Sequence, residues 1–91
     1  MPSENTYANW VLWYASKKRA DEWLTLEDLA TRTYESLVKA SRTMSKLGLV
    51  EADIRADSIR VRITRTGRES LKQEIERVGQ SEFERLLQEV Y

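Results

Sequence analysis

Apolar residues follow a helical period through the first 22 positions of the chain. Tyr7, Trp10 and Tyr14 stand at i, i+3 and i+7, so they share one face of a helix. Trp13 adds apolar surface beside that stripe. The pattern predicts a helix over about residues 3–22, with an apolar arc wider than one small core needs.

A short helix and a turn are expected next. The segment TLED at residues 25–28 has the form of a capping box, in which Thr25 caps a helix over residues 26–30. Residues 31–35 break the apolar pattern, and we expect them to form the turn before the next helix.

The next helix is predicted over residues 36–47, with Ser36 as its N-cap. Apolar positions at helical spacing predict its buried face. That face consists of Leu37, Ala40, Met44 and Leu47. Gly48 follows directly and is suited to end the helix, because glycine tolerates the left-handed conformation of a C-terminal cap.

The period changes from helical to alternating after Gly48. Two strands are expected, over residues 49–54 and 58–63, joined by a short polar turn. The second strand alternates strictly, with Ile59 and Val61 on one face and Arg60 and Arg62 on the other. The two strands therefore predict a β-hairpin with one face packed on the helices.

Helical spacing returns in the last third of the chain. Thr64 or Thr66 is expected to begin a helix, and Thr66 heads a second capping-box pattern. Gly79 interrupts the apolar period, and Ser81 is suited to cap a last amphipathic helix. A break near Gly79 is our prediction, with one continuous helix as the alternative.

Together these elements predict an α+β fold that is mainly α-helical. Ninety-one residues suffice for one domain, so we expect a single domain over residues 1–91. The element order is that of a winged helix-turn-helix. Its parts are the helix-turn-helix at 25–47, a two-stranded wing at 49–63, and flanking helices at 1–22 and 65–91.

The charge is unevenly placed although the net charge is zero. Residues 32–65 hold eight basic and four acidic side chains, whereas residues 69–91 hold three basic and six acidic ones. A basic middle beside an acidic tail favours a polyanionic partner for the middle of the chain.

Three segments resemble winged-helix regulators of the MarR and PadR type. They are TLEDLA at 25–30, MSKLGLVE at 44–51 and RITRTGRESL at 62–71. In such proteins the LGLV segment joins the recognition helix to the wing, and the I-T-x-x-G-R-x-x-L segment ends the wing. The resemblance implies a winged helix that binds double-stranded DNA and regulates transcription.

The candidate DNA contacts lie on the second helix of the helix-turn-helix and on the wing. A helix fits the major groove, where Arg and Lys meet guanine edges or phosphates, and hydroxyls at a helix N-terminus suit phosphate oxygens. Arginines at a hairpin tip can contact the backbone or enter the minor groove. The candidates are Arg32, Thr33, Tyr34, Ser36, Lys39, Arg42, Thr43, Lys46, Arg55, Arg60 and Arg62.

Each candidate also has a purely structural interpretation. The basic residues of the helix can form an ordinary solvated face, and the wing arginines can be the polar face of any antiparallel hairpin. Tyr34 can equally be a packed turn residue. Arg42 and Thr43, at the centre of the outward face, are our candidates for reading bases, with Lys39 and Lys46 holding phosphates.

Surplus apolar surface at the two ends of the chain predicts a homodimer, in which the first and last helices pair across a two-fold axis. The expected interface residues are Tyr7, Trp10, Trp13, Tyr14, Phe83, Leu86, Leu87 and Val90. Such a dimer places two recognition helices one turn of DNA apart and predicts a palindromic site.

Other classes of function find no support in the composition. Without His or Cys, the common zinc sites and nucleophile–base pairs are missing, and we expect no catalytic residues, metal or cofactor. No apolar run of 18 residues and no signal peptide is present, so we expect a cytoplasmic protein without membrane contact. No small-molecule effector is identified. The competing function is a winged helix that binds proteins and not DNA.

Overall fold

Within the described residues, the first helix lies at the centre of the fold, with the other helices and a small sheet around it. The computed structural model describes residues 4–19, 21–26, 31–56 and 58–90, and the side chains of residues 31–33 and 90 lie outside that description. In chain order the elements are α1 (Glu4–Ser16), β1 (Leu24–Leu26), α2 (Thr31–Lys46), β2 (Val50–Ile54), β3 (Ile59–Ile63), α3 (Arg65–Val78), α4 (Gln80–Leu87) and the 3₁₀ helix η1 (Gln88–Val90).

In the part of the chain that the structure describes, the sheet has three antiparallel strands in the order β1-β3-β2. The hairpin of β2 and β3 was expected, and the strict alternation along β3 is confirmed, because Ile59, Val61 and Ile63 are buried while Arg60 and Arg62 are partly exposed. The third strand, β1, was not expected.

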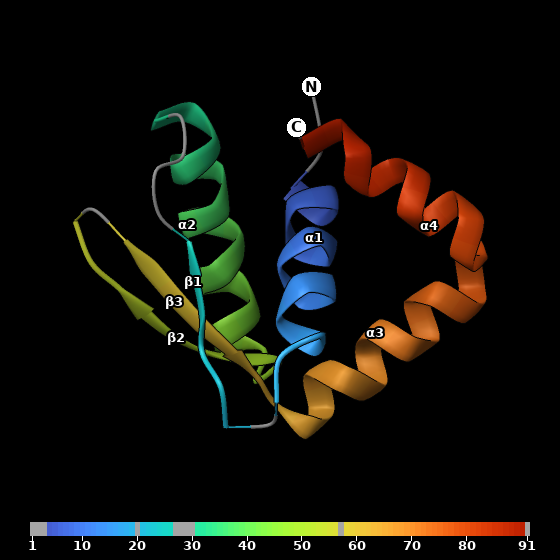
Figure 1. Ribbon diagram of the computed structural model, residues 1–91, viewed down its shortest axis with the longest axis horizontal. Helices are drawn as coiled ribbons and strands as arrows, with labels where there is room; N and C mark the ends of the chain where they lie inside the picture. The colour runs from blue at the N-terminus through green and yellow to red at the C-terminus, as the bar shows by residue number, and fades with distance from the viewer. Residues whose placement is uncertain (1–3, 20, 27–30, 57, 91) are drawn as a thin grey trace.

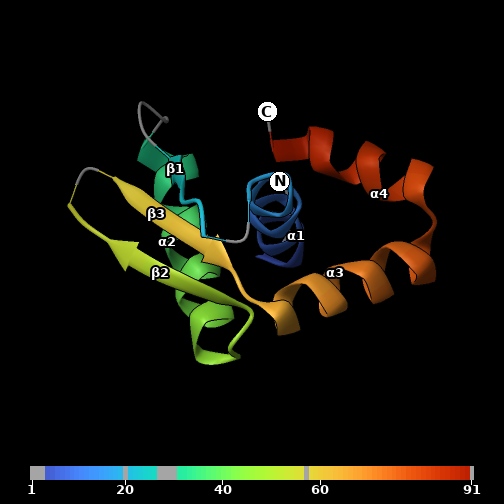
Figure 2. The same cartoon turned by 60° about the horizontal axis from the view of Figure 1, so that its bottom comes forward.

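Helix α1 lies between the sheet with α2 on one side and α3 with α4 on the other, as Figures 1 and 2 show. Val11, Leu12 and Ala15 are almost completely buried at this centre. The wide apolar arc of the first helix is therefore covered within the chain, because α4 and η1 fold back onto α1.

The first helix is shorter than predicted, since it ends at Ser16 and not near residue 22. The guanidinium group of Arg68 donates hydrogen bonds to the carbonyl oxygens of Ser16 and Lys18, at 3.1 and 3.2 Å. These contacts satisfy carbonyl groups that the end of a helix leaves without partners. A residue some 50 positions away thus holds the point where the chain leaves α1.

Three predictions around α2 are wrong. Thr25 belongs to β1, so it does not cap a helix there, and the rest of that expected helix, residues 27–30, lies outside the described residues. The expected turn at 31–35 is helical, because α2 begins at Thr31, and Ser36 lies inside α2 and is not its N-cap. Tyr34 lies in the first turn of α2, and its side chain forms hydrogen bonds with the β2–β3 hairpin.

The end of α2 differs from the prediction in one residue. Gly48 has the positive φ of 76° expected for a residue that ends a helix. Leu37, Ala40 and Met44 are buried as predicted, but Leu47 is 65% exposed. The helix ends at Lys46, and after the turn at Gly48 the core is filled by Val50.

The start of α3 is capped by the residue that precedes it. Thr64 is the N-cap, and its hydroxyl accepts a hydrogen bond from the Gly67 amide at 3.0 Å, so Thr66 is not the cap.

The break at Gly79 is confirmed, since α3 ends at Val78 and α4 begins at Gln80. Ser81 lies inside α4 and does not cap it.

Candidate nucleic-acid interface

The exposed side of α2 carries a row of basic residues. Lys39, Arg42 and Lys46 stand at i, i+3 and i+7, and all three are exposed. We call these three residues the α2 basic strip. Thr43, also exposed, lies beside it. The strip faces away from the core, as the sequence predicts.

One carboxylate reaches the edge of this strip from the first turn of α1. The Thr43 hydroxyl is shared between two acceptors, Glu4 Oε1 at 3.2 Å and the Lys39 carbonyl oxygen at 3.1 Å, and Glu4 Oε2 lies 4.0 Å from Lys39 Nζ. Within the described ranges, no carboxylate forms an ion pair with Arg42 or Lys46. Two of the three cations therefore keep their full charge toward solvent.

The outer face of the sheet places its arginines against carboxylates. The register sets Asp53 opposite Arg60 and Glu51 opposite Arg62 across the β2–β3 pair. Each arginine donates hydrogen bonds to the carboxylate opposite it. The two guanidinium groups also lie over the ring of Trp23, 5.1 and 4.5 Å from its centroid. These arginines are thus engaged within the chain.

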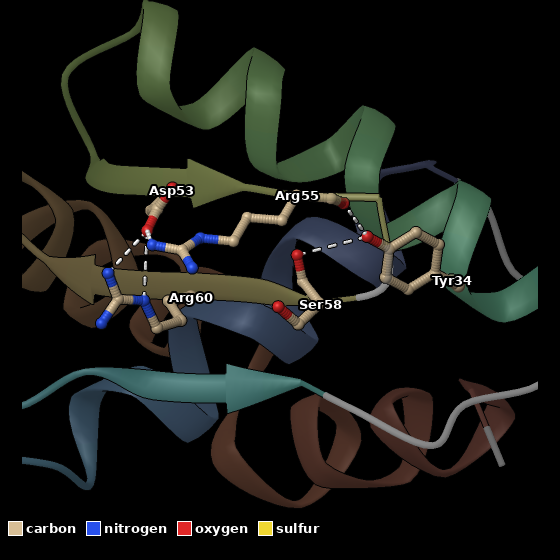
Figure 3. Close-up of polar contacts among 5 residues, drawn as sticks. All are labelled: Tyr34, Asp53, Arg55, Ser58 and Arg60. Carbon is tan, nitrogen blue, oxygen red and sulfur yellow. Dashed lines mark hydrogen bonds and ion pairs between the residues drawn. The ribbon is translucent and has the colours of Figure 1, made fainter.

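Asp53 holds two guanidinium groups at once. Arg60 approaches it at 2.6 Å and Arg55 at 3.3 Å (Figure 3). The hydrogen bonds from Arg60, together with the charge of Arg55, hold the pKa of Asp53 below its usual value. Asp53 is therefore ionised at neutral pH. It offsets part of the positive charge at this end of the hairpin.

Tyr34 connects α2 with the tip of the hairpin. Its hydroxyl is shared between two acceptors, the backbone carbonyl oxygens of Arg55 and Ser58 (Figure 3). The Arg55 amide in turn donates to the Ser58 carbonyl at 2.9 Å, which closes the hairpin. The Tyr34 hydroxyl is thus directed at the hairpin. These contacts favour Tyr34 as a packed structural residue over Tyr34 as a phosphate contact.

We expect the substitution Tyr34→Phe to loosen the hairpin while leaving the helices folded. It removes one shared hydrogen bond, which is worth about 1 kcal/mol of unfolding free energy. Urea unfolding measures that loss, and hydrogen exchange at the Arg55 amide should become faster. An unchanged free energy together with unchanged exchange would show that the hydroxyl does not hold the hairpin.

The remaining candidates for DNA contact are placed as follows. Ser36 is half-buried within α2 and does not stand at a helix N-terminus. Arg32 and Thr33 belong to the first turn of α2, but their side chains lie outside the description. Of the candidates whose side chains are described, the exposed ones are the α2 basic strip, Thr43 and Arg55.

Half of the residues expected at a dimer interface lie in the chain's own core. Tyr7, Trp10, Phe83 and Leu87 are buried, while Trp13 and Tyr14 are half-buried. Trp13 packs against Phe83 with ring centroids 5.6 Å apart, which joins α1 to α4. Leu86 is also half-buried, and the side chain of Val90 lies outside the description.

Comparison with known proteins adds no relative. No protein-family model, curated protein or solved structure matches this chain. Among the residues that the structure describes, no group of three or more acidic side chains is placed to hold a metal ion. In the same part of the chain, no helix has the length and apolar character needed to cross a membrane.

A groove of about 400 Å³ lies next to the strip, between α1, α2 and the middle of α3. Leu12 and Met44 line it, and the exposed Leu47 lines it as well. Thr43 belongs to this lining and also borders the α2 basic strip, so the two surfaces adjoin.

Two residues that contact the candidate basic side chains, Trp23 and Glu4, were not identified from the sequence. Trp23 could have been found, because Trp23 and Thr25 alternate with Leu24 and the buried Leu26. This period-2 signal indicates β1 and its outer face. Glu4 gives no such signal, because only the packing of α1 on α2 brings its carboxylate to Thr43.

Proposed function

We propose that this chain is a winged-helix protein that binds double-stranded DNA as a dimer and regulates transcription. The α2 basic strip is the observation that carries the proposal. The order α1–β1–α2–β2–β3, with an antiparallel sheet beside the exposed helix, supports the winged-helix class. The resemblance of the segments at 25–30, 44–51 and 62–71 to MarR and PadR regulators points the same way.

In this proposal α2 enters the major groove with its strip toward the bases and phosphates. Arg42 lies at the middle of the strip and bears no ion pair to a described carboxylate, so its guanidinium group is available to the O6 and N7 atoms of guanine. Lys39 and Lys46 flank it along the helix and would hold phosphates on either side.

The hairpin has a smaller part in this proposal than the sequence alone suggests. Arg60 and Arg62 would have to leave Asp53, Glu51 and the ring of Trp23 before they could contact a phosphate. Arg55 is more available, because its side chain is mostly exposed and its contact with Asp53 is longer. We therefore assign the backbone contact of the wing to Arg55.

The dimer is part of the same proposal, with a smaller interface than first expected. Tyr7, Trp10, Phe83 and Leu87 stabilise the fold of one chain, so they cannot also cover a partner. The half-buried Trp13, Tyr14 and Leu86 expose part of their surface, and we assign the interface to that surface. Two-fold pairing would present two strips to a palindromic site.

The alternative function is a protein-interaction module with the same fold. The observation that favours it is the groove, together with the exposure of Leu47 at its edge. The engaged arginines of the sheet also reduce the positive charge offered to DNA.

A salt titration of binding to a random DNA duplex separates the two functions. Contacts to phosphates release counterions, so the logarithm of affinity falls linearly with the logarithm of salt concentration. With two to four phosphate contacts per protomer, we expect a slope of about −2 to −4 for each protomer. No binding at 20 °C even at about 20 mM salt, where the Debye length exceeds ~20 Å, would contradict DNA binding and favour the interaction module.

A further inference from the structure

The carboxylate of Glu4 contacts two polar side chains at the edge of the α2 basic strip. Its two oxygens contact a hydroxyl and an ammonium group on neighbouring turns of α2, Thr43 Oγ1 and Lys39 Nζ. A phosphate takes the same donors, since carboxylate and phosphate oxygens are both anionic acceptors of charge-assisted hydrogen bonds. The edge of the α2 basic strip is thus already occupied by an anion of the chain itself.

From this we infer that Glu4 is an internal competitor of DNA phosphate at Lys39 and Thr43, and that binding displaces its side chain. The inference rests on the proposed function, because it concerns the same surface. Displacement is easy, since the Glu4 side chain is 48% exposed and its contacts of 3.2 and 4.0 Å are long. Exposed ion pairs of this kind are weak.

The carboxylates of the sheet, Glu51 and Asp53, are less easily displaced by a phosphate than Glu4 is. Asp53 is bound by Arg60 at 2.6 Å, and Arg60 itself lies over the ring of Trp23. Releasing Asp53 would break a hydrogen bond to a charged group and disturb a cross-strand pair of the hairpin. Glu4 can swing away from α2 without breaking a strand pair, so it is the carboxylate that DNA can replace.

The consequence is a general lowering of affinity that does not depend on DNA sequence. Phosphate contacts carry no sequence information, so a carboxylate that competes with them weakens binding to every duplex alike. Contacts between Arg42 and base edges are not affected in the same way, because Arg42 forms no ion pair with Glu4 or another described carboxylate. Glu4 thereby shifts the balance of the surface from phosphate contacts toward base contacts.

The test compares Glu4→Gln with Glu84→Gln in salt titrations on one random DNA duplex. The two variants change the net charge equally, but Glu84 is exposed on α4, which packs against α1 and α3. We expect Glu4→Gln to bind about two- to fivefold more tightly at low salt, with a salt slope close to that of the unsubstituted chain, because the same phosphates are contacted once Glu4 is displaced. Glu84→Gln should gain much less. Thermal unfolding of both variants checks that the fold is intact.

A second arm places Glu4→Gln in a Lys39→Gln background. If the carboxylate acts through Lys39, most of the gain in affinity should disappear there, as in a double-mutant cycle between two contacting groups. Equal gains from Glu4→Gln and Glu84→Gln, with DNA binding present, would overturn the inference and leave the proposed function standing. Failure of the unsubstituted chain and of both variants to bind DNA at low salt would overturn both.

Discussion

Replacing Gly67 by alanine is expected to destabilise the fold by about 3 kcal/mol or more, the largest effect of any single substitution considered. A Cβ atom at this position would lie 2.0 Å from the carbonyl oxygen of Leu49 and 2.9 Å from Ile63 Cγ1. The Leu49 carbonyl cannot easily retreat, because it accepts a hydrogen bond from the Thr64 amide at 3.0 Å. The Thr64 hydroxyl also lies 2.9 Å from it and is shared with the Gly48 carbonyl oxygen at 2.6 Å. The first turn of α3 would have to move away from the hairpin.

Gly48→Ala is the matched control for this prediction. Gly48 has a φ of 76° with open space around its position, so an added methyl group strains the backbone without striking a neighbour. That strain costs about 1–2 kcal/mol. Urea unfolding followed by circular dichroism measures both variants. If Gly67→Ala lost no more free energy than Gly48→Ala, the close approach of α3 to Leu49 would be softer than its geometry indicates.

Local signals were sufficient for the hairpin and for much of α2. The alternation around Val61 has period 2, and the buried positions Leu37, Ala40 and Met44 have a helical period, so both follow from backbone geometry alone. Gly48 and Gly79 were found for the same reason, since each has a positive φ at the end of a helix. Where the prediction from sequence was correct, the residues that determine the local structure lie within about one helical turn of each other along the chain.

The errors arise where a distant residue decides the local structure. The end of α1 depends on Arg68, and the helical first turn of α2 contains Tyr34, which the hairpin holds. Thr25 satisfies a capping pattern, yet Leu24 and Leu26 pair with β3, and the strand prevails. Such contacts join residues that lie 20 to 50 positions apart, so no window along the chain contains both partners.

The candidate interface shows the same division. The α2 basic strip follows from helical spacing, and its exposure agrees with the prediction. The charge on the sheet could not be predicted from residue counts, because strand register decides that Glu51 faces Arg62 and Asp53 faces Arg60. A shift of one residue would turn these side chains to the other face. Thus the formal charge of the hairpin overstates what it offers to DNA.

The double variant Arg42→Gln/Lys46→Gln is expected to weaken binding to duplex DNA by about 30- to 150-fold, or about 2–3 kcal/mol. Both residues are exposed, and neither forms an ion pair with a described carboxylate, so their loss removes charge from the proposed contact without breaking a contact in the fold. Because Lys46 is assigned to a phosphate, the salt slope should become shallower by about one unit per protomer. Fluorescence anisotropy at three or more salt concentrations measures both quantities.

The control, Lys72→Gln/Arg85→Gln, removes two charges from α3 and α4. Lys72 is exposed, and Arg85 pairs with Glu82 on its own helix, so neither belongs to the strip. If the controls weakened binding as much as the strip variants, attraction would come from the overall charge of the chain, and α2 would have no special place in it. A loss confined to Arg42 and Lys46 requires direct contact, because charges more than about 10 Å from the DNA are screened at 0.1 M salt. The variants therefore distinguish a surface that docks on DNA from a chain that is merely attracted to it.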